Sequence, residues 1–260
     1  RHRRGADLAV KVTGAQGYFG LMNSWMPSAI MDSVASYSYV AAGNSELVLL
    51  NRNVIEVRSL TGVLENAFDA SGATGRTPSY LAVAPNGDIY TDDYSGGQVL
   101  RFSPQGRLIG TLPVEGPLAL AADRAGGVYV STSNGLARFG ADGQLQRTLS
   151  IESATSIAVA RNGDLYVSGI ASAPRISHFD ASGRFKGAFG MVGRRLDQFD
   201  LPDPHGLAVD DRGLVWVTDR TRLLGLSPAG KVTRLCGLRF SSRRRSFIYG
   251  DSVASTSGAV

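Results

Sequence analysis

The sequence has very little cysteine and histidine. Its 260 residues include one cysteine, Cys236, and three histidines. A single cysteine excludes an intrachain disulfide and a C-x-x-C metal or redox site. Cysteine usage therefore leaves the compartment open, and we interpret Cys236 as a buried apolar side chain.

The chain also lacks long apolar runs and the common catalytic motifs. No stretch of about 18 uninterrupted apolar residues is present, so the sequence predicts no transmembrane helix. The first residues do not have the order of a signal peptide, and since the chain does not begin with Met we interpret it as a processed form or a fragment. No G-x-S-x-G, H-E-x-x-H or P-loop pattern occurs, so no motif assigns a catalytic residue.

Positive charge is concentrated at the two ends of the chain. Arginine outnumbers lysine by 24 to 3, and the formal net charge is +5. Three arginines lie within residues 1–4 and three more at 243–245, which leaves the rest of the chain close to neutral. A basic surface attracts nucleic acid, but we interpret these end clusters as solvated and disfavour a nucleic-acid partner.

A strand–turn–strand unit occurs four times. PHGLAVDDRGLVWVTD (204–219) has copies at 80–93, 120–132 and 156–169. In each copy a short strand rich in Ala and Val precedes a turn that contains glycine. The second strand of each copy then carries an aromatic residue: Tyr90, Tyr129, Tyr166 or Trp216.

A second hairpin follows each copy. QVLRFSPQGRLIGTL, for example, has an apolar strand, a turn that closes on glycine and a further strand. Alternating polarity and short Gly/Asn/Asp turns are typical of antiparallel hairpins, so each unit predicts four short strands in meander order. Such a sheet is apolar on both faces and can bury them only against neighbouring copies, which predicts an all-β propeller.

The pattern favours six blades over five. A weaker fifth unit lies at 36–69, and the two ends resemble two halves of a sixth: LAVKVTGAQGYFG (8–20) and GLRFSSRRRSFIYGD (237–251). We therefore predict that shared N- and C-terminal strands close the ring, and that residues 23–35 form a short helix. The predicted single domain spans 1–260, with blades at about 33–72, 77–114, 115–150, 153–190 and 203–236, and a closing blade from 237–260 plus 5–22.

The repeat resembles the NHL family of β-propellers. GRRLDQFDLPDPHGLAVDDRGLVWVTD carries the pattern F-x-x-P-x-x-G-[LI]-A-V-D-x-x-G-x-[VI]-[YW]-V-x-D nearly whole, and looser copies cover 78–112, 116–149 and 153–190. The resemblance implies an NHL-like ring with four-stranded blades. It implies no single activity, because NHL-like propellers include RNA-binding modules, sensor domains, interaction scaffolds and lyases, and related six-bladed rings include lactonases.

Candidate binding residues lie in the loops that enter the first strand of a blade or leave the second. In rings of this kind these loops share one face near the axis. Propeller lyases and lactonases place histidines or carboxylates there. The candidates are His205 before a first strand, Asp92, Asp93 and Asp219 at the ends of second strands, Arg220 and Arg222 beyond Asp219, and Arg194 and Arg195 in an insertion at 191–203. We interpret His178, on a later strand, as a surface residue.

The resulting functional hypothesis is a non-catalytic NHL-type scaffold for a protein or ligand, as part of a larger assembly or an ectodomain. It predicts a protein partner docking on the 92–98 loop and the 191–203 insertion, with no cofactor and no metal. One alternative is a metal-dependent lyase or lactonase-like enzyme in which His205, Asp92 and Asp219 converge. A second alternative is an RNA-binding module that uses the four arginine candidates. A secreted or periplasmic location in a bacterium is favoured.

Overall fold

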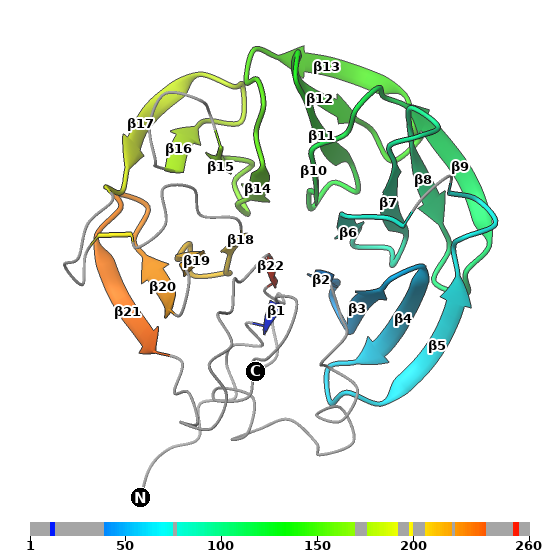
Figure 1. The fold of residues 1–260 in the computed structure, drawn as a ribbon. Helices are drawn as coiled ribbons and strands as arrows, with labels where there is room; N and C mark the ends of the chain where they lie inside the picture. Colours follow the sequence, from blue (N-terminus) through cyan, green and yellow to red (C-terminus); the bar gives the residue numbers. More distant parts are fainter. Residues whose placement is uncertain are drawn as a thin grey trace, which may run out of the picture.

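Five four-stranded antiparallel sheets radiate around a central axis (Figure 1). The computed structural model describes residues 11–13, 39–74, 77–169, 176–191, 198–199, 206–219, 222–237 and 252–254. In each sheet the strands follow chain order from the axis outward. This arrangement is the predicted propeller of four-stranded blades.

The blades are numbered here in chain order. Blade 1 contains β2 (Tyr39–Ala42), β3 (Glu46–Asn51), β4 (Val54–Ser59) and β5 (Leu64–Asp69). Blade 2 contains β6 (Leu81–Val83), β7 (Ile89–Asp93), β8 (Gln98–Phe102) and β9 (Leu108–Pro113). Blade 3 contains β10 (Ala119–Ala122), β11 (Val128–Thr132), β12 (Gly135–Phe139) and β13 (Leu145–Leu149).

The remaining two blades follow the same order. Blade 4 contains β14 (Ser156–Val159), β15 (Leu165–Ser168), β16 (Ile176–Phe179) and β17 (Phe185–Phe189). Blade 5 contains β18 (Gly206–Val209), β19 (Val215–Asp219), β20 (Arg222–Leu226) and β21 (Val232–Gly237).

The prediction of six four-stranded blades is wrong, because the structure has five. Between blades 5 and 1 lies a two-stranded sheet of β1 (Lys11–Thr13) and β22 (Ser252–Ala254), with Val12 opposite Val253. β22 contacts the innermost strands on both sides, β18 and β2. The described parts of the two ends contribute one short strand each, which is too little pairing for a full blade. The predicted helix at 23–35 lies outside the described residues.

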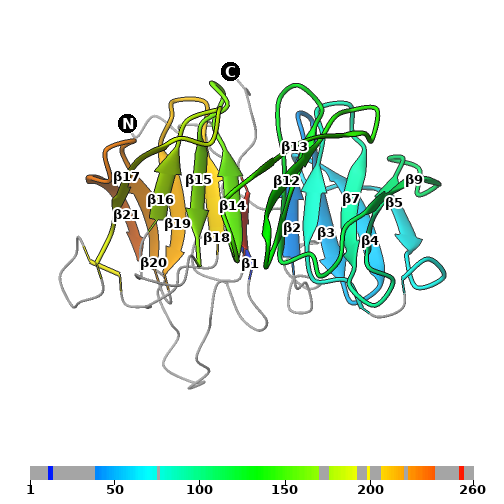
Figure 2. The ribbon, with the colours of Figure 1, turned by 90° about the horizontal axis from the view of Figure 1, so that it is seen from above.

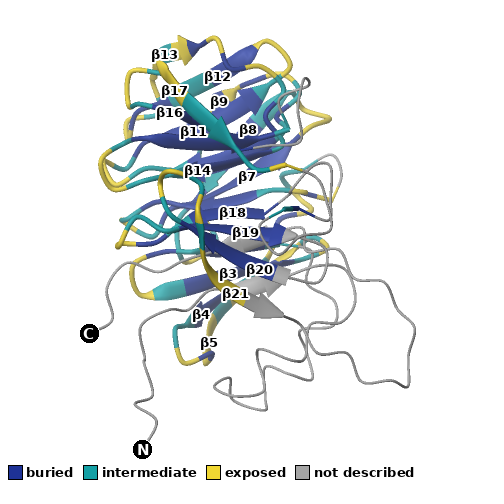
Figure 3. Ribbon diagram, turned by 90° about the vertical axis from the view of Figure 1, so that its left-hand side faces the viewer, coloured by how far each residue is buried: buried dark blue, intermediate teal, exposed yellow. Residues whose placement is uncertain are grey.

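Each blade is apolar on both faces, and these faces form four interblade cores. In blade 2, Leu81 and Val83 pack with Val48 and Leu50 of blade 1. The intervening Ala82 instead packs with residues of blade 3. This alternation follows from the two-residue period of a strand. It explains why the blades stack radially and leave mainly the turns and the outermost strands exposed (Figure 3).

A side chain on the outer strand of one blade fits against a glycine in the last turn of the next. At Gly230 of blade 5, φ is 81°, and an added Cβ would lie 2.3 Å from Cβ and Cγ of Phe189 in blade 4. At Gly106 it would lie 2.5 Å from Cγ of Phe68. The turn glycines thus supply positive φ and also make room for the neighbouring blade.

The ring has two faces, and Figure 2 shows it from the edge. We call one the turn face, because it carries the turns between the first and second strands of each blade, at 43–45, 85–87, 124–126, 161–163 and 211–213. We call the other the loop face. It carries the connections that enter the first strand and leave the second, such as 77–80 and 94–97.

Candidate binding face

The described sequence candidates form two pairs in different blades. Asp92 and Asp93 end β7 in blade 2. Asp219 ends β19 in blade 5 and lies opposite Arg222, the first residue of β20. The other candidates lie outside the described residues: His205, Arg194, Arg195 and Arg220.

Asp92 is buried and fixes the entry into its own blade. Its side chain is 1% exposed, and Oδ1 accepts hydrogen bonds from the backbone N–H groups of Ser79 at 2.7 Å and Tyr80 at 2.8 Å. Thr91 Oγ1 donates to the carbonyl of Tyr80 at 2.8 Å. These contacts hold the segment that enters β6 against the end of β7, a positioning role typical of a carboxylate in a turn.

Asp93 orders the loop that follows β7. Its Oδ1 accepts a hydrogen bond from the N–H of Gly96 at 3.1 Å, and its Oδ2 accepts one from Gln98 Nε2 at 3.0 Å. The N–H of Val114 donates to the carbonyl of Gly97 at 3.2 Å. The loop therefore presents Tyr94, which is 47% exposed, from a hydrogen-bonded frame. The sequence analysis proposed the 92–98 loop as a docking segment but did not single out Tyr94 within it.

The insertion at 191–203 is described only in part. The N–H of Phe199 donates to the carbonyl of Met191 at 2.8 Å. Phe199 is buried in the core between blades 4 and 5, next to Gly190. That this insertion lies on the same face of the ring as the 92–98 loop stays a prediction.

A pocket lies at the axis of the ring, and we call it the channel. Its described lining comes from the five innermost strands, β2, β6, β10, β14 and β18, and from the turns that follow them. Arg124 and Asp211 line its mouth at the turn face and form an ion pair, although they come from blades 3 and 5. The sequence analysis did not identify this pair, because the two turns are far apart in the chain and meet only when the ring forms.

Blades 2 and 3 each contain the same kind of internal contact, in which a turn carboxylate, an arginine and a tyrosine lie together. Asp88 accepts a hydrogen bond from Arg101 Nε at 2.8 Å, and Asp123 accepts one from Arg138 Nε at 2.8 Å. In blade 2 the guanidinium carbon of Arg101 lies 5.7 Å from the centre of the Tyr90 ring. This geometry adds a cation–π contact to the ion pair.

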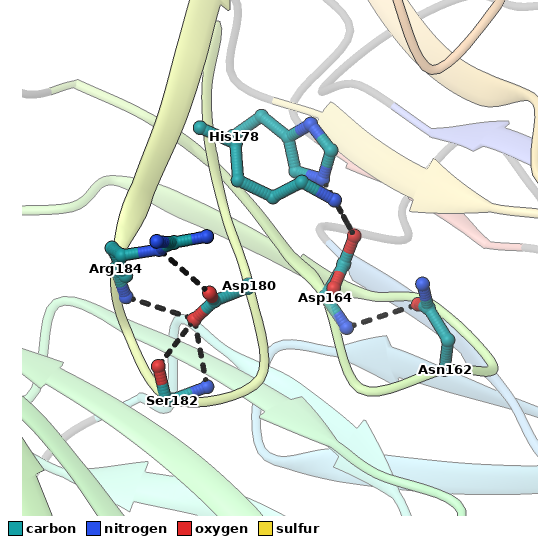
Figure 4. Close-up of polar contacts among 7 residues, drawn as sticks. Asn162, Asp164, His178, Asp180, Ser182 and Arg184 are labelled. Carbon is teal, nitrogen blue, oxygen red and sulfur yellow. Dashed lines mark hydrogen bonds and ion pairs between the residues drawn. The ribbon is translucent and has the colours of Figure 1, made fainter.

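Blade 4 has a histidine in the arginine position (Figure 4). His178 Nε2 lies 2.8 Å from Asp164 Oδ2, and the imidazole stacks on Tyr166 at 4.4 Å. The prediction that His178 is a surface residue is wrong, since it is 9% exposed. Its register explains the burial, because it lies opposite Tyr166 just as Arg101 lies opposite Tyr90.

Two pKa values in blade 4 reflect this packing. Burial alone would raise the pKa of Asp164, but hydrogen bonds with Lys186 and His178 outweigh it, so the pKa lies below its usual value. Burial, assisted by the negative charge of Asp164, raises the pKa of Tyr166 to about 12. The carboxylate therefore stays charged and the phenol neutral at pH 7.

In blade 5 a tryptophan bonds to the turn carboxylate, and a glycine takes the position of the arginine. Trp216 Nε1 donates a hydrogen bond to Asp210 Oδ2 at 3.0 Å, and Gly225 lies opposite the indole. An added Cβ on Gly225 would lie 3.2 Å from Trp216 Cζ3. The larger ring thus occupies the space of the arginine and supplies the donor itself.

Within the part of the chain that the structure describes, no three His, Cys, Asp or Glu side chains are grouped closely enough to hold a metal ion. The proposed convergence of His205, Asp92 and Asp219 depends on a residue outside that part. No helix among the described residues is long and apolar enough to span a membrane.

The chain is similar to known proteins in one repeat and in fold. Residues 201–222 match the NHL repeat model. A comparison with curated protein sequences found no similar protein. A Bacteroides caccae protein of unknown function has a similar structure, with a TM-score of 0.62 and 14% identity over 85% of this chain and 86% of that chain.

Two enzymes are also similar in fold. Virginiamycin B lyase from Staphylococcus aureus has a TM-score of 0.57 and 12% identity over 98% of this chain and 80% of that chain. Hydrazine synthase from Kuenenia stuttgartiensis has a TM-score of 0.54 and 14% identity over 74% of this chain and 76% of that chain. The chain thus carries one recognisable NHL repeat in blade 5, and its blades have the radial arrangement of a β-propeller.

Proposed function

We propose that this propeller is an interaction scaffold whose loop face docks a protein partner. The observation that carries this proposal is the 94–97 loop, which Asp93 holds in a hydrogen-bonded frame with Tyr94 exposed. A loop that is ordered before binding loses little conformational entropy on docking. Tyrosine combines a large apolar ring with a polar hydroxyl and is enriched among residues that dominate interface energies.

The contacts of Asp92 and Asp93 support a structural rather than a chemical role for these two carboxylates. Asp92 accepts two backbone hydrogen bonds from the entry into its blade, and Asp93 accepts two from its own loop. Both side chains are nearly fully buried. The carboxylates of Asp92 and Asp93 thus shape the loop face. Tyr94 is the partly exposed side chain through which we propose that a partner docks.

Capture experiments with immobilised protein test this proposal. Wild-type protein, Tyr94→Ala and the turn-face variant Arg161→Ala would be incubated with extract of the source organism, and bound proteins quantified by mass spectrometry. We expect a partner that wild type and Arg161→Ala retain equally and that Tyr94→Ala retains at least ten-fold less, the scale of a central interface residue. Equal retention by all three proteins would count against loop-face docking.

A metal-dependent lyase is the second candidate, supported by the similarity in fold to virginiamycin B lyase over 98% of this chain. Metal analysis of the purified protein tests it. The lyase proposal expects one metal ion per chain in wild type and none in His205→Ala, with both proteins folded. Absence of stoichiometric metal from wild-type protein refolded with zinc or calcium would remove this candidate. RNA binding stays a prediction from the sequence and requires affinity that falls steeply with salt.

A further inference from the structure

The turn-face mouth of the channel combines a confined space with one accessible arginine. Arg124 comes from the β10–β11 turn and Asp211 from the β18–β19 turn. In the ring, blade 4 lies between the two blades that supply this pair. The channel wall just inside the mouth carries small apolar side chains: Ala42, Ala122, Val159 and Val209.

The wall also offers backbone hydrogen-bonding groups. Each innermost strand is the first in its sheet, so one of its edges pairs with β-strand neighbours and the other faces the axis. Near the loop face, the N–H of Leu207 donates across the blade boundary to Ser156 Oγ at 3.2 Å. The channel thus presents both apolar surface and polar backbone edges, a combination suited to a small ligand with a polar group.

The ion pair itself contributes little to the stability of the ring. The Arg124 side chain is 45% exposed and that of Asp211 is 30% exposed. Ion pairs between side chains exposed to this degree contribute little to stability, because water screens the charges and ordering two side chains costs entropy. A carboxylate from solution can therefore replace Asp211 on the guanidinium at small cost.

We propose that this mouth is a binding site for a small organic carboxylate. Arg124 holds the carboxylate through paired N–H···O hydrogen bonds, which match the planar guanidinium. The short carbon chain points into the channel, between Ala122 and Val159. Asp211 acts as an internal competitor that occupies Arg124 when the ligand is absent. This site lies on the opposite face from the proposed docking loop and does not depend on it.

Propionate is a suitable probe, with propionamide as its uncharged match. Binding would be followed by NMR through the backbone amide signals of residues 122–126 and 209–212. We expect saturable shifts with propionate and at least ten-fold weaker binding of propionamide. Equal binding of the two compounds, or no saturation, would overturn the proposal.

Three variants locate the site. Arg124→Gln should weaken propionate binding at least ten-fold, and Asp211→Asn should strengthen it several-fold by removing the competitor. Arg161→Gln is the matched control, since Arg161 is exposed on the neighbouring turn but does not line the channel. Each variant is first checked for an unchanged thermal midpoint. Loss of binding in Arg161→Gln equal to that in Arg124→Gln, or weaker binding in Asp211→Asn, would contradict the assignment.

Discussion

At the scale of single residues, the aromatic position of the second strand shows how one site is filled in different ways. Tyr90, Tyr166 and Trp216 occupy the same place in blades 2, 4 and 5, yet their polar groups differ. Trp216 donates to buried Asp210, whereas the hydroxyl of Tyr90 has no hydrogen-bond partner among the described residues. The indole N–H of Trp216 therefore stabilises blade 5, whereas the buried hydroxyl of Tyr90 costs free energy in blade 2.

Substitution of these two residues by phenylalanine should have opposite effects. Trp216→Phe leaves the Asp210 carboxylate without its donor and should lower the free energy of unfolding by about 1–3 kcal/mol. Tyr90→Phe removes a buried hydroxyl with no partner and should be neutral or stabilising by up to about 1 kcal/mol. Urea unfolding of both variants measures the difference. An equal loss in both variants would contradict the proposed difference in hydrogen bonding.

Asp180 allows a pH prediction at the same scale. Hydrogen bonds from Ser182 Oγ and the N–H of Arg184, followed by weaker contributions, lower the pKa of Asp180 to about 2 (Figure 4). Because the folded pKa is depressed, the stabilisation is present above the ordinary value of about 4 and is lost as the pH falls towards 2.

Ser182→Ala should raise the pKa of Asp180 towards its ordinary value, since the hydroxyl makes the largest contribution. NMR titration of the Asp180 carboxyl carbon measures this pKa directly. Asp69, whose pKa is also lowered but through Ser71, serves as an internal control that should not change. A pKa of Asp180 that stays near 2 would show that the backbone donors suffice.

At the scale of strands and turns, the contact between a turn glycine and the preceding blade predicts unequal costs for the same substitution. Gly230 and Gly143 have similar φ values, 81° and 78°. An added Cβ at Gly143 would make an ordinary contact of 3.6 Å with Leu112, whereas at Gly230 it would lie 2.3 Å from Phe189. Only the second site combines backbone strain with a steric clash.

Gly143→Ala should therefore cost about 1–2 kcal/mol from positive φ alone. Gly230→Ala should cost about 1–3 kcal/mol more, because Phe189 must shift. Thermal unfolding of both variants gives the difference. The double variant Gly230→Ala with Phe189→Ala serves as the test of cause, since it should show less than the sum of the single losses. Equal costs for the two glycine substitutions would contradict the role of packing.

The sequence predicted elements better than their contacts. The repeats around Tyr90 and Trp216 correctly indicated hairpins, because alternating polarity and glycine turns are local signals. The burial of His178 depends on its partner strand and on Asp164, and no local pattern reveals that. Arg124 and Asp211 meet only across the axis, so their pairing required the closed ring. The segments 8–20 and 237–251 each resembled half a blade in sequence. That resemblance did not predict how many of their residues pair with a neighbouring strand.

At the scale of the whole molecule, closure of the ring depends on the pairing of β1 with β22. Val12 and Val253 lie directly opposite each other in this two-stranded sheet. Residues opposed in this way have Cα atoms about 4.5–5.5 Å apart, within the range of a disulfide.

Val12→Cys with Val253→Cys, in a Cys236→Ala background, should therefore form a disulfide on mild oxidation. The bond should raise the thermal midpoint, because it constrains a very long loop in the unfolded chain. Lys11→Cys with Val253→Cys is the matched control, since neighbouring strand positions point to opposite faces. Non-reducing electrophoresis detects the bond. Equal cross-linking of the two pairs would argue against the register.

The position of β22 also has a consequence for synthesis. β2 is synthesised early, whereas β22, its neighbour at the closure, follows only after all five blades. Until then no strand lies between blades 5 and 1, and apolar blade faces left uncovered in a partly synthesised chain favour wrong association. Synthesis of β22, rather than completion of any single blade, is thus the step that allows the ring to close.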